Sequence, residues 1–135
     1  MIKLFLVAAL AALALAGCSK PDDASTSTDP YAGLEREFLN WRSDIEATHR
    51  SCRFKFDNKG CEAFQITCKA QQEITADETA RGITAQIIAA MTFVGRDGDG
   101  SGGSPGSSFA IFSKTGGAWT RVDTSPVNLS TCAPA

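Results

Sequence analysis

Large apolar residues after position 30 recur at steps of three or four positions and their multiples. The positions concerned are Leu34, Phe38, Trp41, Ile45 and Cys52. This spacing places the apolar side chains on one face of a helix and leaves the charged residues on its other faces. Asp29-Pro30 is a helix start signal, because proline is favoured at the first helical position. We therefore expect a helix over residues 31–51 whose apolar stripe covers a sheet.

Period-two alternation follows the turn Asp57-Asn58-Lys59-Gly60. Apolar residues then occupy alternate positions, at Phe64, Ile66, Cys68, Ala70 and Ile74. This pattern is typical of a half-buried strand, and it would direct the Cys68 side chain into the core. Thr75 and Glu78 have the spacing of a capping box, which predicts a short helical turn that ends at Gly82.

Residues 83–94 alternate like a strand, although their alanines would also suit a helix. We expect a strand, because β-branched and aromatic residues extend to both ends of the segment. Residues 95–107 contain six glycines and one proline, which predicts a loop. Two short apolar runs at 109–114 and 119–123 flank a Gly-Gly turn and predict a hairpin.

Together these elements predict an α+β fold with one N-terminal helix packed on a roughly four-stranded antiparallel sheet. A single helix lying across a curled sheet is similar to the architecture of cystatin-like and nuclear transport factor 2-like domains. The chain carries no sequence motif of either group, so the similarity concerns architecture alone. It implies nothing about function.

The first 18 residues have the three parts of a bacterial export signal. Lys3 gives a positive start, residues 4–16 are an unbroken apolar run, and small residues lead to the cysteine of Leu15-Ala16-Gly17-Cys18. This ending resembles the lipobox of bacterial lipoproteins. As a helix the 13 apolar residues would span only about 20 Å, too short for a hydrocarbon core of roughly 30 Å.

The resemblance implies cleavage before Cys18 and several acyl chains on that cysteine, including palmitate, which would hold the protein firmly at a membrane. Ser19 follows Cys18 where an aspartate would favour the inner membrane, so the resemblance implies the outer membrane, facing the periplasm. Residues 19–30 contain no large apolar side chain and are typical of a flexible tether. The expected parts are a signal peptide at 1–17, a lipidated cysteine and tether at 18–30, and one domain at 31–135.

Four cysteines remain besides Cys18, namely Cys52, Cys61, Cys68 and Cys132. An even number in an exported chain favours disulfides, and four cysteines allow three pairings. We favour Cys52–Cys61, which would close the junction between helix and strand. The second pair would then be Cys68–Cys132, which would tie down the C-terminal tail. The spacing matches no zinc pattern, and the chain has a single histidine.

Residues suited to chemistry are few, and none predicts a cofactor. Part of a calcium-loop pattern is present at Asp97, Asp99, Ser101 and Gly102. The twelfth position of that loop needs a carboxylate and is Ser108 here, so the metal candidate is weak. His49 lies near the predicted helix end, where a histidine suits the helix dipole without being catalytic. The chain shows no nucleophile elbow and no assignable acid–base pair, so we expect no enzyme activity.

Partner binding is the function class that these features favour. Trp119 lies beside a hairpin turn with Arg121 on the same strand face, and we expect this pair to be exposed to a partner. Asp97 and Asp99 of the glycine-rich loop are further contact candidates. Without residues 1–17 the chain carries 12 basic and 15 acidic side chains, a formal charge of −3. We see no block of like charge that would indicate a nucleic acid or an anionic surface as partner.

The leading hypothesis is a non-catalytic envelope lipoprotein that binds another envelope protein or a cell-wall component, or has a structural role. One alternative is an inhibitor or immunity-type lipoprotein that acts against an exported hydrolase. Another is a small-ligand-binding domain with its pocket between helix and sheet, which ligand-dependent thermal stabilisation would reveal.

Overall fold

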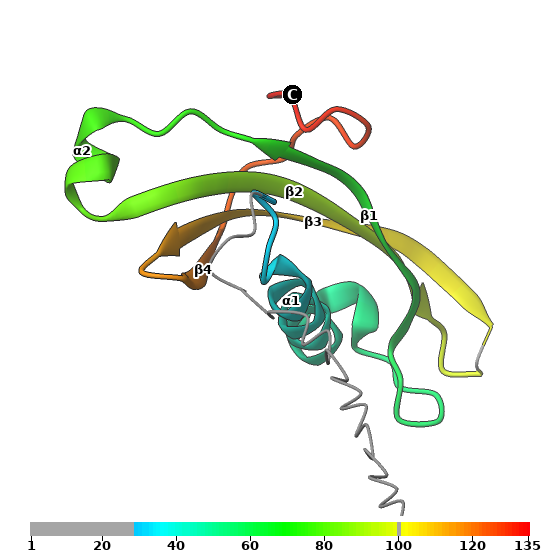
Figure 1. Cartoon of the computed structure of the whole chain (residues 1–135). Helices are drawn as coiled ribbons and strands as arrows, with labels where there is room; N and C mark the ends of the chain where they lie inside the picture. The colour runs from blue at the N-terminus through cyan, green and yellow to red at the C-terminus, as the bar shows by residue number, and fades with distance from the viewer. Residues whose placement is uncertain (1–28, 100) are drawn as a thin grey trace, which may run out of the picture.

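The computed structural model describes residues 29–99 and 101–135, so the predicted signal peptide, Cys18 and the tether up to residue 28 lie outside the described residues. An N-terminal helix is followed by a four-stranded antiparallel sheet with the strand order β1-β2-β3-β4. Figure 1 shows the sheet curled around α1 on one side and the C-terminal tail lying on the other. The predicted α+β class is confirmed. No helix within the described ranges has the length and apolar character to cross a membrane.

The helices and strands follow the predicted order with shifted ends. They are α1 (Leu34–Thr48), the 3-10 turn η2 (Arg50–Cys52), β1 (Cys61–Gln71), α2 (Ala76–Ala80), β2 (Ile83–Arg96), β3 (Gly102–Thr115) and β4 (Ala118–Asp123). Helix α1 is shorter than the predicted 31–51. It starts after Gly33, whose φ of 82° is left-handed, and it ends at the extended backbone of His49. The capping box of Thr75 and Glu78 is present at the start of α2.

The predicted loop over residues 95–107 is wrong, because β2 and β3 extend through most of it. Three of its glycines, Gly95, Gly103 and Gly106, lie where another group occupies the space of a side chain. A Cβ on Gly106 would come within 2.3 Å of the Phe93 ring, and one on Gly103 within 2.7 Å of the Gly95 carbonyl oxygen. Glycine inside a strand permits this kind of close approach. Part of the glycine content therefore reflects packing within the strands, and the connection between β2 and β3 is shorter than predicted.

Strand β1 changes face in the middle, which the alternation pattern did not predict. Phe64 and Ile66 pack against the core on the α1 side, whereas Cys68 and Ala70 belong to a cluster on the opposite side of the sheet. The register explains the change, because Ile66 pairs with Met91 while Cys68 pairs with Ala90. Thr67 is the extra residue of a β-bulge, and one extra residue reverses every later side chain. Cys68 is buried in a core, as predicted, but that core lies on the side of the sheet away from α1.

Aromatic side chains fill the space between α1 and the central strands. Phe112 makes edge contacts with Trp41 at a centroid distance of 5.5 Å and with Phe38 at 5.2 Å. Trp41, Phe93 and Phe112 are buried, as the predicted helical stripe requires. Strand β2 is buried on both faces over Ile87–Met91, since the tail covers the side that α1 does not.

Both predicted disulfides are present. Cys52–Cys61 closes a short loop between η2 and β1, and Cys68–Cys132 fixes the tail to the far side of the sheet. The tail also folds on itself, since the Asn128 side chain accepts hydrogen bonds from the backbone N–H groups of Ser130 and Thr131. The two bridges thus stabilise opposite sides of the sheet.

Candidate functional site

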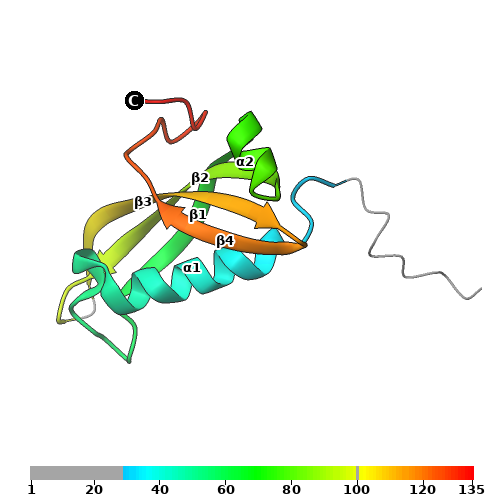
Figure 2. The same ribbon diagram turned by 90° about the vertical axis from the view of Figure 1, so that its left-hand side faces the viewer.

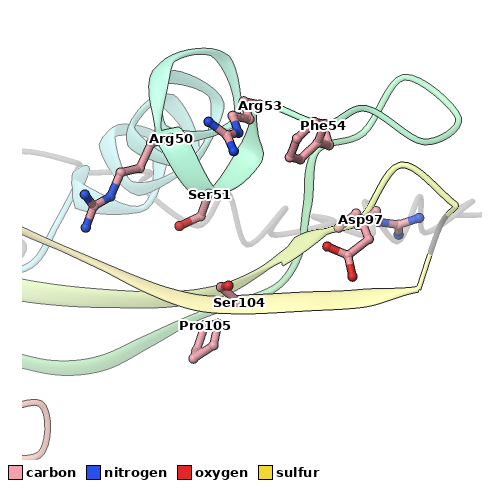
Figure 3. Close-up of a pocket in the computed structure, with 8 residues that line it drawn as sticks. Arg50, Ser51, Arg53, Phe54, Asp97, Ser104 and Pro105 are labelled. Carbon is pink, nitrogen blue, oxygen red and sulfur yellow. The ribbon is translucent and has the colours of Figure 1, made fainter.

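A pocket of about 370 Å³ opens between the C-terminal end of α1 and the tip of the β2–β3 hairpin. Its walls are formed by Arg50, Ser51, Arg53, Phe54, Arg96, Asp97, Ser104 and Pro105 (Figure 3), and we call it the arginine pocket. A second hollow of about 630 Å³ adjoins it and shares Arg50, Ser51 and Pro105. Figure 2 shows η2 and the hairpin tip at the opposite end of α1 from residues 29–33. The 15 residues of α1 separate the two ends by about 22 Å.

Two glycines allow η2 to lie directly on the sheet. A Cβ on Gly95 of β2 would be 2.1 Å from the Ser51 carbonyl oxygen, and one on Gly60 would be 1.9 Å from that of Cys52. No side chain fits at either position. The pocket-lining residues of η2 are therefore held against the sheet by main-chain contacts and by the Cys52–Cys61 disulfide.

The loop over residues 53–60 is tied to α1 by Glu46. The Glu46 carboxylate accepts hydrogen bonds from the backbone N–H groups of Gly60 and Cys61, the latter at 2.9 Å. Lys55 Nζ lies 3.3 Å from the same carboxylate and donates to the Glu46 carbonyl at 2.6 Å. Within the described ranges, Glu46, Cys52 and Cys61 form the one cluster with metal-ligand spacing. Both sulfurs are joined in a disulfide and cannot act as thiolate ligands.

His49 has a structural role at the junction of α1 and η2. Its Nδ1 accepts a hydrogen bond from the Ser51 N–H at 3.1 Å, and its ring contacts the edge of Phe93 at a centroid distance of 4.8 Å. Burial and the neighbouring Arg50 charge lower the pKa of His49 below its ordinary value. The neutral imidazole therefore caps η2, instead of acting as the cation at a helix end that its sequence position suggests.

The arginines of the pocket differ in how they are paired. Arg96 donates to the Glu62 carboxylate at 2.8 Å, whereas neither Arg50 nor Arg53 forms a salt bridge with any described residue. The Arg53 guanidinium lies 4.7 Å from the centre of the Phe54 ring, a cation–π contact that orients it. Figure 3 places Arg50 and Asp97 at opposite ends of the pocket, with Ser51 and Arg53 between them. Two exposed guanidinium groups are thus free of an internal carboxylate.

Only one of the four predicted partner-binding residues lines this pocket, and that residue is Asp97. Asp99 lies in the adjacent turn, where the Ser101 backbone N–H and hydroxyl donate to it at 2.9 and 2.6 Å. These hydrogen bonds lower the pKa of Asp99. The Ser101 hydroxyl is also 3.3 Å from Asp97 Oδ2. In the weak calcium candidate of Asp97, Asp99 and Ser101, one carboxylate oxygen of each aspartate therefore accepts a hydrogen bond from Ser101.

The expectation that Trp119 and Arg121 form an exposed pair is wrong. Trp119 is buried, and its indole N–H donates to the Ala32 carbonyl at 2.9 Å. Arg121 does share its strand face, but that face is turned toward α1, where Arg121 donates to Asp44 at 2.6 Å. Both residues attach β4 to the helix. The position of these residues beside a turn could not predict their burial or pairing, because the contacts join residues more than 70 positions apart.

Sequence reasoning also missed Arg50, Arg53 and Arg96. Residues 50–59 carry four basic side chains and one acidic side chain, a net charge of +3, whereas residues 18–135 as a whole carry −3. Serine, cysteine and phenylalanine residues separate the basic ones, so no uninterrupted block is visible. A signal for Arg53 is the pair Cys52 and Cys61, which brackets three basic side chains and one acidic side chain, with Arg50 two positions before the first cysteine. Arg96 joins them only through the three-dimensional fold.

The pocket offers guanidinium and hydroxyl donors together with one carboxylate, a set suited to binding an anionic group. Comparisons of the chain with models of protein families, with characterised proteins and with solved structures found no match. The function is therefore inferred from the residues of the site.

Proposed function

We propose that this protein is a lipid-anchored component of a bacterial envelope, and that its domain is a non-catalytic binding module. The arginine pocket carries this proposal. It is an open, positively charged site at the end of α1 that lies farthest from the expected tether. A domain held at a membrane through residues 18–30 would present this end to other molecules of the envelope.

A binding role agrees with the chemistry of the pocket better than catalysis does. Asp97 is the one carboxylate among the described lining residues, and no histidine or cysteine lines the pocket. His49, which lines the adjoining hollow, uses its Nδ1 to cap η2. General acid–base catalysis needs a positioned pair of proton-transfer groups. The site instead provides donors for recognition.

The anchor is supported by the lipobox-like Leu15-Ala16-Gly17-Cys18, and Cys18→Ser tests it. The wild-type protein is expected in the membrane fraction and labelled by a palmitate analogue. The variant is expected to lose the label and to leave the membrane fraction. Equal labelling and equal fractionation of the two proteins would refute the anchor.

The binding role is tested by photocrosslinking in intact cells. A photoreactive amino acid placed at Ser104, in the wall of the pocket, is expected to capture one partner reproducibly. The matched control is the same amino acid at Asp77, which is exposed on α2 at the other end of the sheet (Figure 1). Failure at Ser104, or the same products from both positions, would contradict the proposal. Capture of an exported hydrolase would specify the function as inhibition.

A further inference from the structure

We infer that the arginine pocket binds an acidic segment of another polypeptide in extended form. This inference rests on the proposed binding function and adds the chemistry of the partner. Carboxylates of the partner would pair with Arg50 and Arg53. The partner's backbone N–H groups would face Asp97.

The first support is charge. Arg50 and Arg53 are exposed and form no salt bridge with a described residue, whereas Arg96 and Arg121 are both paired with carboxylates. The net charge of +3 over residues 50–59 contrasts with −3 for residues 18–135. An acidic partner is therefore repelled by most of the domain and attracted by the end that carries the arginine pocket. This difference in charge would orient the partner as it approaches.

The second support is the shape of the pocket. A compact dianion such as phosphate needs donors that converge on one point, yet Arg50 and Arg53 project in different directions (Figure 3). The Asp97 carboxylate would repel a dianion in the same space. In an extended peptide, alternate side chains lie on one side about 7 Å apart, and N–H groups lie between them. Such a chain offers spaced carboxylates to the arginines and donors to Asp97.

The third support is that contacts within the domain hold η2 in place and orient Arg53 before binding. Arg53 is stacked on Phe54, and η2 is fixed by Gly60, Gly95 and the Cys52–Cys61 disulfide. A preformed site loses less conformational entropy on binding. Phe54, half-exposed, and Pro105 provide apolar surface for the stem of a glutamate side chain or for a neighbouring apolar residue.

Fluorescence anisotropy with the full-length protein in detergent tests the inference. The probe is a labelled peptide of alternating glutamate and serine, and its control has glutamine in place of glutamate. We expect the glutamate peptide to bind more tightly than the glutamine peptide, with an affinity that falls as salt is raised. Arg50→Gln and Arg53→Gln are each expected to weaken binding about tenfold. Arg81→Gln, an exposed arginine after α2, is the charge-matched control and is expected to change nothing.

Competition separates the peptide from other anions. Inorganic phosphate and vesicles of anionic phospholipid are expected to displace the peptide only weakly. Equal binding of the two peptides, an equal effect of Arg81→Gln, or stronger binding of phosphate or vesicles would overturn the inference. If the peptide fails while photocrosslinking from Ser104 succeeds, the partner chemistry is wrong and the binding role stands. If Ser104 captures nothing, the binding role itself fails.

Discussion

Individual glycines decide how closely the segments of this domain approach one another. Gly60 and Gly95 accommodate the carbonyl oxygens of Cys52 and Ser51, and Gly106 lies against the Phe93 ring. Each glycine lies in a strand or next to one, where it would ordinarily reduce stability. Here the loss of stability at Gly60 and Gly95 is offset because η2 can pack directly on the sheet.

Gly95→Ala is expected to destabilise the protein by about 2 kcal/mol or more, because the new methyl group would overlap a main-chain carbonyl that cannot rotate away. Urea denaturation measures the change. Gly98→Ala is the control, since no atom lies within 4 Å of a Cβ at that position. Equal stability of the two variants would show that η2 is not held as described.

His49 gives the stability of the domain a pH dependence at mildly acidic pH. Its pKa is lowered in the folded state from the ordinary value of 6.5, so the unfolded chain takes up this proton first as the pH falls. The free energy of unfolding should therefore decrease below about pH 6.5, until the pKa of the folded state is passed. His49→Asn keeps an acceptor for the Ser51 N–H and removes the titration. Urea denaturation at pH 7.5 and pH 5 should show a smaller decrease for this variant than for the wild type.

Among the elements, the loop over residues 53–60 is attached to α1 through Glu46 and is also closed by the Cys52–Cys61 disulfide. The Glu46 carboxylate of α1 accepts hydrogen bonds from the backbone N–H groups of Gly60 and Cys61, and it also forms a salt bridge with Lys55. One side chain thus joins the end of the helix to the start of β1. The position of Arg53 within the loop follows from this attachment.

Glu46→Gln is expected to destabilise the protein by about 1–2 kcal/mol, because an amide NH₂ group would replace an oxygen that accepts a backbone N–H. The exposed Glu73→Gln is the matched control and is expected to be neutral. Urea denaturation compares the two. Binding of the acidic peptide should also weaken in Glu46→Gln, because the loop that carries Arg53 would be less firmly attached to α1. Unchanged stability and unchanged binding would show that Glu46 does not hold this loop in place.

At the scale of the whole molecule, the sheet separates two cores with different functions. The larger core lies under α1 and supports the pocket, and the smaller lies under the tail and contains Cys68–Cys132. The two disulfides also lie on opposite sides of the sheet, one in each core. We therefore expect stability and binding to depend on the two sides to different extents.

Removal of each disulfide by paired Cys→Ala substitutions tests this division. Loop-closure entropy predicts a loss of about 4 kcal/mol for Cys68–Cys132, whose residues are 64 positions apart, and about 3 kcal/mol for Cys52–Cys61, at 9 positions. We expect the Cys68–Cys132 variant to be the less stable and to keep its peptide affinity while folded. The Cys52–Cys61 variant is expected to bind more weakly. The reverse order for binding would contradict the division.

Local signals in the sequence predicted most of the fold. The helical stripe at Trp41, the capping box at Thr75 and the strand over residues 83–94 depend on neighbours close in the chain, and all three are present. Both cysteine pairings were also predicted, because one closes a local junction and the other ties down a terminus.

The features that were missed depend on contacts between distant residues. The bulge at Thr67 needs the register with β2, and the burial of Trp119 needs Ala32 at the other end of the chain. The arginine pocket likewise combines η2 with the end of β2. No periodicity within one segment contains this information, and of the four residues predicted to bind a partner only Asp97 lines the arginine pocket.

The smaller core, on the side of the sheet away from α1, also matters while the chain is being synthesised. A nascent chain that has reached Asp123 contains all of the helix-side core, yet Ile88, Ala90, Phe109 and Ile111 lack the cover that Val127 and Cys132 later provide. Uncovered apolar surface of this kind attracts chaperones and promotes aggregation. We therefore expect that a premature stop codon after residue 123 would keep every residue that lines the arginine pocket and still yield a product that cellular quality control treats as misfolded.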